Sequence, residues 1–242
     1  MAIQITYKSS SYTTSAGNVT CSPTWTPQAN SLIVAFCALT YASSPVDPTG
    51  VAGHGISYSA MTLGTSTLST THKLSGWAAK AGASPSSAAC VATVSGTTTG
   101  GLVIEFEVTG ADVSGTALQA FQATNASNTG TSTTPTVTLA GFTDALNRAM
   151  TFAVVLANAA PTTSGAWILT TGAAGNFTNP ATGAVALFEN NQFDTAGACN
   201  TSNAAWRMVG IEIKASKTQT VYFSSAKPAM QSLETYGAGV TF

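Results

Sequence analysis

The sequence predicts an all-β fold, a jelly-roll-like antiparallel β-sandwich, and two observations carry that prediction. Short runs with period-two alternation and many β-branched or aromatic residues recur along the chain, separated by Gly, Pro, Asn and Ser. Two such runs about a hundred residues apart, 101–108 (GLVIEFEV) and 207–214 (RMVGIEIK), end on nearly the same pattern. No long stretch has the period of an amphipathic helix.

Looser pairs precede this repeat, 32–38 with 150–157 and 75–80 with 184–189. Two similar antiparallel halves suit a double-sheet jelly roll, because each half can cover the apolar face of the other. An internal duplication is therefore one interpretation, and chance similarity in an Ala/Thr/Ser-rich sequence is the other. A chain of 242 residues can bury a sizeable core. We expect a single sandwich domain at 1–215, followed by an extension at 216–242.

Thirteen strands follow from the alternation, the β-branched content and the flanking turn residues. They are expected near 2–7, 31–40, 56–63, 73–80, 88–95, 101–109, 117–124, 134–140, 148–157, 166–171, 183–189, 195–200 and 205–214. The segment 31–40 is apolar on both faces, which predicts a central strand covered on both sides. The segment 103–108 instead alternates, with Glu105 and Glu107 on one face, and this predicts a strand with one solvated side.

Composition limits the function classes. The chain has 8 Lys and Arg and 9 Asp and Glu, which together make up only 7% of its residues. Nucleic-acid binding needs clustered basic side chains, so no nucleic-acid partner is expected. No apolar run is long enough to span a bilayer, so no membrane partner is expected either. Residues 2–7 resemble a strand rather than a secretion signal, which favours assembly in a cytosol.

The sequence offers little for catalysis, and no enzymatic activity is expected. The two histidines, His54 and His72, are interpreted as polar surface residues, and no serine-hydrolase or phosphate-loop motif is present. Glu105 and Glu107 have the separation of a glycosidase pair. An exposed ladder of charge pairs with Glu212 and Lys214 of the repeated strand is the better interpretation. No catalytic residue and no cofactor are predicted.

The four cysteines are far apart in the sequence, so no compact metal site is expected. They are Cys21, Cys37, Cys90 and Cys199, which are interpreted as small residues that pack in the core, with one disulfide as the alternative. The tryptophans Trp77 and Trp206 lie in apolar runs and are expected in the core. Tyr41 and Tyr58 flank a loop and are candidates for stacking on a glycan.

The last 27 residues differ in character from the sandwich, since they contain apolar groups that a solvated tail does not need. They are interpreted as an arm that docks on a neighbouring subunit, with a frayed tail as the alternative. The candidate partner-binding residues are Tyr222, Phe223, Tyr236 and Phe242.

Six short stretches resemble segments of bacteriophage structural proteins and of repetitive bacterial surface proteins. They are 30–36 (NSLIVAF), 75–82 (SGWAAKAG), 91–96 (VATVSG), 104–112 (IEFEVTGAD), 130–139 (GTSTTPTVTL) and 210–214 (GIEIK). The resemblance covers 28–215 and implies a jelly-roll-like building block or adhesive module, with no catalytic residues to carry over.

Together with the charge-poor composition, the resemblance predicts a non-enzymatic virion protein. The leading expectation is a capsid decoration protein, whose partners are copies of itself and the major capsid protein. The alternatives are a tail or fibre subunit and a carbohydrate-binding module that recognises a cell-surface glycan.

Overall fold

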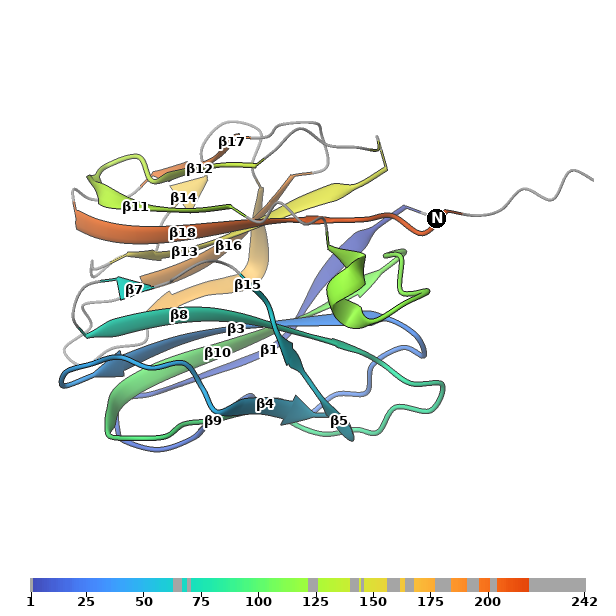
Figure 1. Ribbon diagram of the computed structural model, residues 1–242, viewed down its shortest axis with the longest axis horizontal. Coiled ribbons are helices and arrows are strands. Elements are labelled where there is room, and N and C mark those ends of the chain that lie inside the picture. The colour runs from blue at the N-terminus through green and yellow to red at the C-terminus, as the bar shows by residue number, and fades with distance from the viewer. Residues whose placement is uncertain are drawn as a thin grey trace, which may run out of the picture.

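The computed structural model is built from antiparallel β-sheets stacked in layers (Figure 1), which confirms the all-β sandwich. It describes residues 2–62, 67–68, 71–121, 126–139, 144, 146–155, 162–163, 168–176, 184–190, 196–200 and 204–217. Within them the only helix is the short 3-10 turn η1 (Ala117–Ala120), where the sequence predicted a strand. No helix in this part of the chain has the length and apolar content needed to cross a bilayer.

The first half of the chain forms one pair of sheets. Its main sheet has the order β1-β10-β3-β8-β6, with β7 also paired to β8, and its covering sheet has the order β2-β9-β4-β5. The strands are β1 (Gln4–Thr13), β2 (Val19–Thr20), β3 (Leu32–Tyr41), β4 (Gly50–Gly53), β5 (Ile56–Ser57), β6 (Ser59–Ala60), β7 (Thr67–Leu68), β8 (His72–Lys80), β9 (Val91–Thr93) and β10 (Thr98–Thr109). Eight of them in two four-stranded orders, β1-β10-β3-β8 and β2-β9-β4-β5, make a jelly roll.

The second half repeats this strand order. Its main sheet is β11-β18-β13-β16-β15, and three further strands follow the order β12-β17-β14. The strands are β11 (Ala126–Ser132), β12 (Thr136–Thr138), β13 (Arg148–Val155), β14 (Thr162–Thr163), β15 (Ile168–Asn176), β16 (Ala184–Asn190), β17 (Ala196–Asn200) and β18 (Ala204–Ile213). The strand pairs recognised from the sequence, β10 with β18, β3 with β13 and β8 with β16, hold equivalent places in the two main sheets, as an internal duplication requires.

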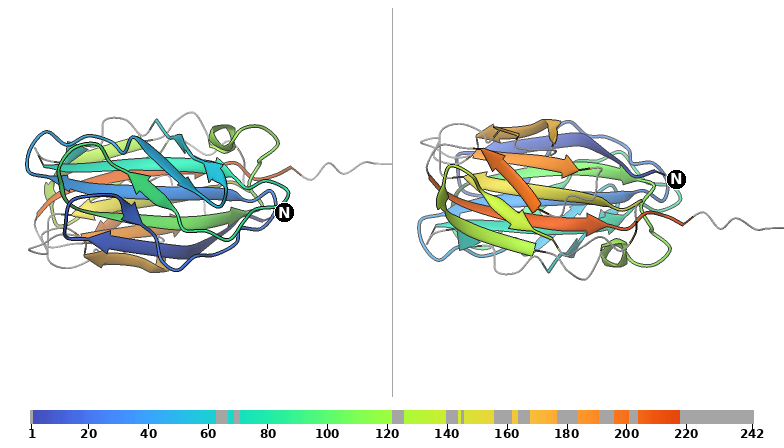
Figure 2. Two further views of the ribbon diagram at one scale, coloured as in Figure 1. Left: turned by 90° about the horizontal axis from the view of Figure 1, so that it is seen from below. Right: turned by 90° about the horizontal axis from the view of Figure 1, so that it is seen from above.

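The two main sheets face each other in the middle of the molecule (Figures 1 and 2). Their facing side chains form one buried apolar cluster that includes Phe36 and Phe106 from the first half and Met150, Val209 and Ile211 from the second. A second cluster lies on the opposite face of the first main sheet, beneath the covering strands, and includes Val19, Ile33 and Trp77. The molecule thus has more layers than the two expected for one sandwich.

Strand β3 lies between these two clusters, and all ten of its residues are buried, which confirms the prediction of a doubly covered central strand. Trp77 and Trp206 are buried as predicted. The sandwich contacts continue to Ser216, whose backbone N–H donates to the Gly110 carbonyl at 2.8 Å. Residues 218–242, which hold most of the predicted arm, lie outside the described residues.

Candidate functional site

The face of β10 that carries Glu105 and Glu107 is the most polar part of the interior. β10 is a central strand, paired with β1 on one side and with β3 on the other. Its even-numbered residues point toward the second half, so the two glutamates point toward the covering sheet. Both are buried, at 0% and 2% exposure. The prediction that this strand has a solvated side is wrong, because the covering sheet closes over it.

The predicted charge ladder with the repeated strand is also wrong. β18 belongs to the other main sheet, so Glu105 and Glu107 do not lie beside Glu212 and Lys214. Glu212 is itself buried, where it accepts a hydrogen bond from Asn147 Nδ2 at 2.7 Å.

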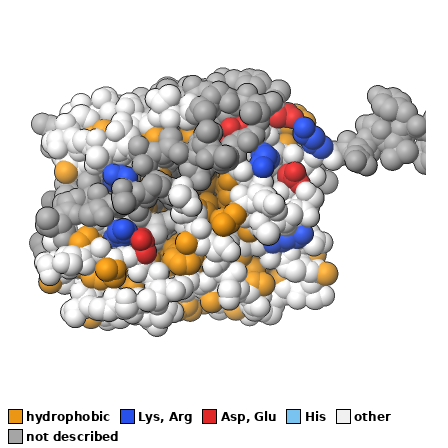
Figure 3. Space-filling model, in the orientation of Figure 1, with side chains coloured by type: hydrophobic (Ala, Val, Ile, Leu, Met, Phe, Trp, Pro, Cys, Tyr) orange, Lys and Arg blue, Asp and Glu red, His pale blue; other side chains and the backbone are white. Residues whose placement is uncertain are grey.

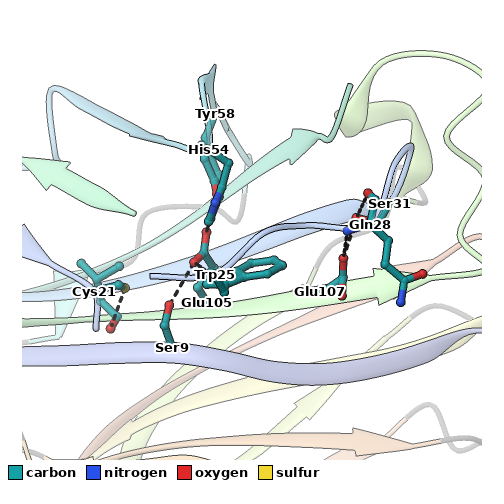
Figure 4. Close-up of polar contacts among 10 residues, drawn as sticks. Ser9, Cys21, Trp25, Gln28, Ser31, His54, Tyr58, Glu105 and Glu107 are labelled. Atoms are coloured by element: carbon teal, nitrogen blue, oxygen red, sulfur yellow. Dashed lines mark hydrogen bonds and ion pairs between the residues drawn. The ribbon is translucent and has the colours of Figure 1, made fainter. Parts of the chain in front are cut away.

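Four side chains donate hydrogen bonds to the carboxylate of Glu105 (Figure 4). Oε2 accepts from Ser9 Oγ at 3.0 Å and from Trp25 Nε1 at 2.6 Å. Oε1 accepts from His54 Nε2 at 3.0 Å and from the Tyr58 hydroxyl. A carboxylate has about four lone-pair positions, so each position of Glu105 has a donor. We call these five residues the Glu105 cluster.

The donors keep Glu105 ionised inside the protein. Burial raises the pKa of its carboxyl, but the hydrogen bonds from His54, Tyr58 and Trp25 outweigh that effect and leave the pKa below its usual value. Burial, followed by the charge of Glu105, raises the pKa of Tyr58, which therefore remains a protonated donor. The cluster is a buried anion held by neutral and aromatic donors.

His54 reaches this cluster through a tight hairpin. It forms, with Gly55, the two-residue turn between β4 and β5, and both residues have positive φ, 57° and 77°. Positive φ at both central positions is the mark of a type I′ turn. The turn points the imidazole inward, at 1% exposure, so the prediction of a polar surface histidine is wrong here. The ring packs against Trp25 with centroids 4.6 Å apart, and its Nδ1 has no hydrogen-bond partner among the described residues.

A bulge in β1 supplies two polar side chains to the same face. Tyr7 pairs with Phe106 and Ser9 pairs with Glu105, so Lys8 is an extra residue between them. An extra residue lets two successive side chains point to one side of a strand. Ser9 donates to Glu105, and Lys8 Nζ forms an ion pair with Glu107 at 2.8 Å.

Glu107 ties the segment before β3 to the sheet. It accepts from the Gln28 backbone N–H at 2.5 Å and from Ser31 Oγ at 3.0 Å, in addition to the ion pair with Lys8 (Figure 4). The ammonium of Lys8 also lies 4.9 Å from the centre of a Trp25 ring. The two buried glutamates therefore hold the segments that contain Trp25, Gln28 and Ser31 against the sheet.

Two cysteines lie next to Glu105. Cys21 and Cys90 face each other just beyond the β2–β9 pair, where the Cys21 N–H donates to the Cys90 carbonyl at 2.8 Å. Their Sγ atoms and a carboxylate oxygen of Glu105 all lie within 4.8 Å of one another, and all three residues are buried. The contact with Cys21, and then burial, raise the pKa of Cys90. Cys37 is a buried free thiol as predicted, while the side chain of Cys199 is outside the described set.

The tyrosines predicted to stack on a glycan are both buried. Tyr58 is 6% exposed and belongs to the Glu105 cluster. Tyr41 is 4% exposed, and its hydroxyl donates to the Val46 carbonyl at 3.0 Å. Neither ring presents an open face to a sugar. The candidate partner-binding residues Tyr222, Phe223, Tyr236 and Phe242 lie outside the described residues.

A groove of about 630 Å³ lies beside Tyr41, at the loops that follow β3 and β9. Its lining is mostly small and hydroxylated: Tyr41, Ala42, Ser43, Ser44, Val46, Ser95, Gly96 and Thr97. These described lining residues supply hydroxyls to bind a polar ligand, and Tyr41 is the only titratable group among them.

Comparisons with known proteins give no relative for this chain. No protein-family model, no curated protein and no solved structure matches it.

Proposed function

We propose that this chain is a non-enzymatic structural protein of a bacteriophage virion, and that it decorates the capsid by binding to the head lattice. Its partners are then copies of itself and the major capsid protein, and it is assembled in the host cytoplasm. It works by contact, through hydroxyl-rich and apolar surface rather than through charge.

The observation that carries the proposal is the direction in which the reactive groups point. His54, Glu105, Glu107 and the thiols of Cys21 and Cys90 lie inside, where they bind loops and strands to one another. The face seen in Figure 3 is mostly white and orange, with separate patches of blue and red, and charged residues make up only 7% of the chain. A β-sandwich whose surface carries few charges suits permanent contact with other subunits, because such a surface gives little protection against association with other proteins.

The fold supports the proposal by analogy. Jelly rolls build both viral capsid domains and lectins, so the architecture favours an assembly or binding role over a reaction. The short stretches that resemble phage structural proteins point to the first of these roles. Many identical copies on a lattice also add avidity to a weak single contact.

Co-sedimentation tests the decoration role. The full chain is mixed with empty heads of the same phage and centrifuged, and we expect it to pellet at a fixed ratio to the major capsid protein. A variant that ends at residue 217 keeps the described sandwich and separates binding by the last 25 residues from binding by the sandwich. A chain that stays in the supernatant at every capsid concentration contradicts the proposal.

Labelling of whole particles distinguishes the head from the tail. Antibody against the chain, visualised by electron microscopy on intact virions, should mark the head. Label on the tail or fibres would support the tail or fibre alternative instead.

The hydroxyl-lined groove beside Tyr41 favours the carbohydrate-binding alternative. A glycan array tests it with the wild type and with Ser95→Trp, since Ser95 is an exposed lining residue whose enlargement would fill the groove. Ser57→Trp, at an exposed position of β5 outside the groove lining, is the control. Saccharide binding that Ser95→Trp abolishes and Ser57→Trp retains would support the lectin role over decoration.

A further inference from the structure

We propose that Cys21, Cys90 and Glu105 form a buried site for one divalent transition-metal ion, with Zn²⁺ as the best fit. The site goes beyond the proposed function and does not depend on it. It departs from the expectation drawn from sequence spacing, because Cys21 and Cys90 are 69 positions apart and meet only when β2 pairs with β9.

The distances fit a metal centre. Zn–S bonds of about 2.3 Å and Zn–O bonds of about 2.0–2.2 Å place the ligand atoms of a tetrahedral site about 3.5–3.8 Å apart. Here the two Sγ atoms and the carboxylate oxygen already lie within 4.8 Å of one another. Binding requires these ligand atoms to move toward one another by about 1 Å.

The charge balance also fits. Without metal, the buried group consists of two neutral thiols and one ionised carboxylate. When M²⁺ binds, each thiol releases its proton to solvent and its sulfur lone pair forms a bond to the metal. Two protons leave for each dication, so the net charge of the buried group does not change. Binding therefore adds no uncompensated charge to the interior, which would be costly.

The surroundings supply the outer contacts that ligand groups need. Ligating carboxylates are usually held by further hydrogen bonds. Glu105 is oriented by Ser9 and Trp25 on one oxygen and by His54 and Tyr58 on the other (Figure 4). Because the lone-pair positions of Glu105 already accept four hydrogen bonds, one donor gives up its bond when a carboxylate oxygen binds the ion.

Two thiolates and a carboxylate select the metal. Thiolates favour Zn²⁺ over Mg²⁺ and Ca²⁺, which bind oxygen ligands almost exclusively. The three residues are at most 3% exposed, so the site is buried, and three protein ligands leave the fourth tetrahedral position for a water molecule. Its ligands join β2 and β9 of the covering sheet to β10 of the main sheet.

Metal titration of the full chain tests the site. The protein is purified with a reductant, stripped with a chelator and titrated with Zn²⁺, and with Cd²⁺ because Cd–thiolate bonds absorb in the near ultraviolet. We expect one equivalent to bind, about two protons to be released per ion in weak buffer, and the thermal unfolding midpoint to rise. The absence of a thiolate band, or of proton release, overturns the proposal.

Variants assign the ligands. Cys21→Ser and Cys90→Ser should each lose the Cd²⁺ band and weaken binding at least a hundredfold. Cys37→Ser is the matched control, since Cys37 is a buried free thiol in the same apolar cluster but is not one of the three converging ligands. Equal binding by Cys21→Ser and the wild type overturns the site.

X-ray absorption on the wild type with bound zinc gives an answer even if a variant fails to fold. The expected spectrum has two sulfur neighbours at about 2.3 Å, and one without sulfur contradicts the proposal. Recovery of Cys21 and Cys90 as a disulfide from freshly lysed cells would also overturn it.

Discussion

Replacing Glu105 with glutamine tests whether the buried carboxylate stabilises the fold, because the change keeps the shape and removes the charge. The amide oxygen can accept from Ser9 and Trp25, which leaves the amide N–H groups facing His54 and Tyr58. The Tyr58 hydroxyl can turn to accept one of them. His54 can accept only by moving its proton to Nδ1, a buried atom with no partner.

The expected destabilisation follows from these bonds. Two charge-assisted hydrogen bonds of about 1.5–3 kcal/mol each are lost, and about one neutral bond of about 1 kcal/mol is regained. Removing a buried charge also relieves its desolvation. The pKa of Glu105 is lowered, however, so the donors stabilise the ionised form by more than burial destabilises it. We expect Glu105→Gln to lower the free energy of unfolding by about 2–4 kcal/mol.

Guanidinium unfolding at pH 7, followed by tryptophan fluorescence, measures the effect, because the Trp25 indole donates to this carboxylate. Asp47→Asn is the control. Asp47 is 52% exposed and lies 3.3 Å from Lys73 Nζ, so its loss should change stability by less than about 1 kcal/mol. A Glu105→Gln variant that loses no more stability than Asp47→Asn would refute the reasoning.

Three further changes test other parts of the structure. Folding lowers the pKa of Glu105, so its ionised carboxylate stabilises the fold at pH values above the carboxyl pKa of the unfolded chain. This stabilisation is lost as the pH falls through the pKa of the folded protein. The free energy of unfolding should therefore fall less on acidification for Glu105→Gln than for the wild type. Gly53→Ala should lower the free energy of unfolding by about 1–3 kcal/mol, because a Cβ there would lie 2.8 Å from the Ala89 carbonyl oxygen. Gly50→Ala in the same strand is the control, since a Cβ there meets open space and should change the stability little. Phe106→Ala removes a fully buried ring between the two main sheets and should cost about 3–5 kcal/mol in denaturant unfolding; a cost below 1 kcal/mol would contradict the packing of the two halves.

The main sheets could be predicted from the sequence because their strands carry their own pattern. The run 31–40 is apolar on both faces, and β3 is buried throughout. The repeats at 101–108 and 207–214 mark strands with equivalent places in two sheets. Each of these strands is long enough for alternation or a continuous apolar run to be visible.

The covering sheet and the Glu105 cluster could not be predicted in the same way. β2 and β5 have only two residues each, and β4 lies in a Gly-rich stretch where the sequence predicted no strand. Alternation shows that Glu105 and Glu107 share a face, but not that another layer covers it. The inward turn at His54 and the bulge at Lys8 depend on backbone geometry that no side-chain pattern encodes.

Positions that face the shared core are alike in the two halves. Ile104 and Ile211 occupy equivalent positions, opposite Phe36 and Met150 in the neighbouring strands, and all four side chains lie in the shared core. A change there in one half must fit the other half.

The outward faces have no such constraint, because each packs only on its own covering strands. Glu105 lies opposite Ala35, as Glu212 lies opposite Ala149, so the repeat preserves the position of the carboxylate. Glu105 nevertheless has four donors and two thiols beside it, whereas Glu212 accepts from Asn147. Chemistry particular to one half, such as the proposed metal site, can therefore arise beneath a covering sheet without disturbing the core that joins the halves.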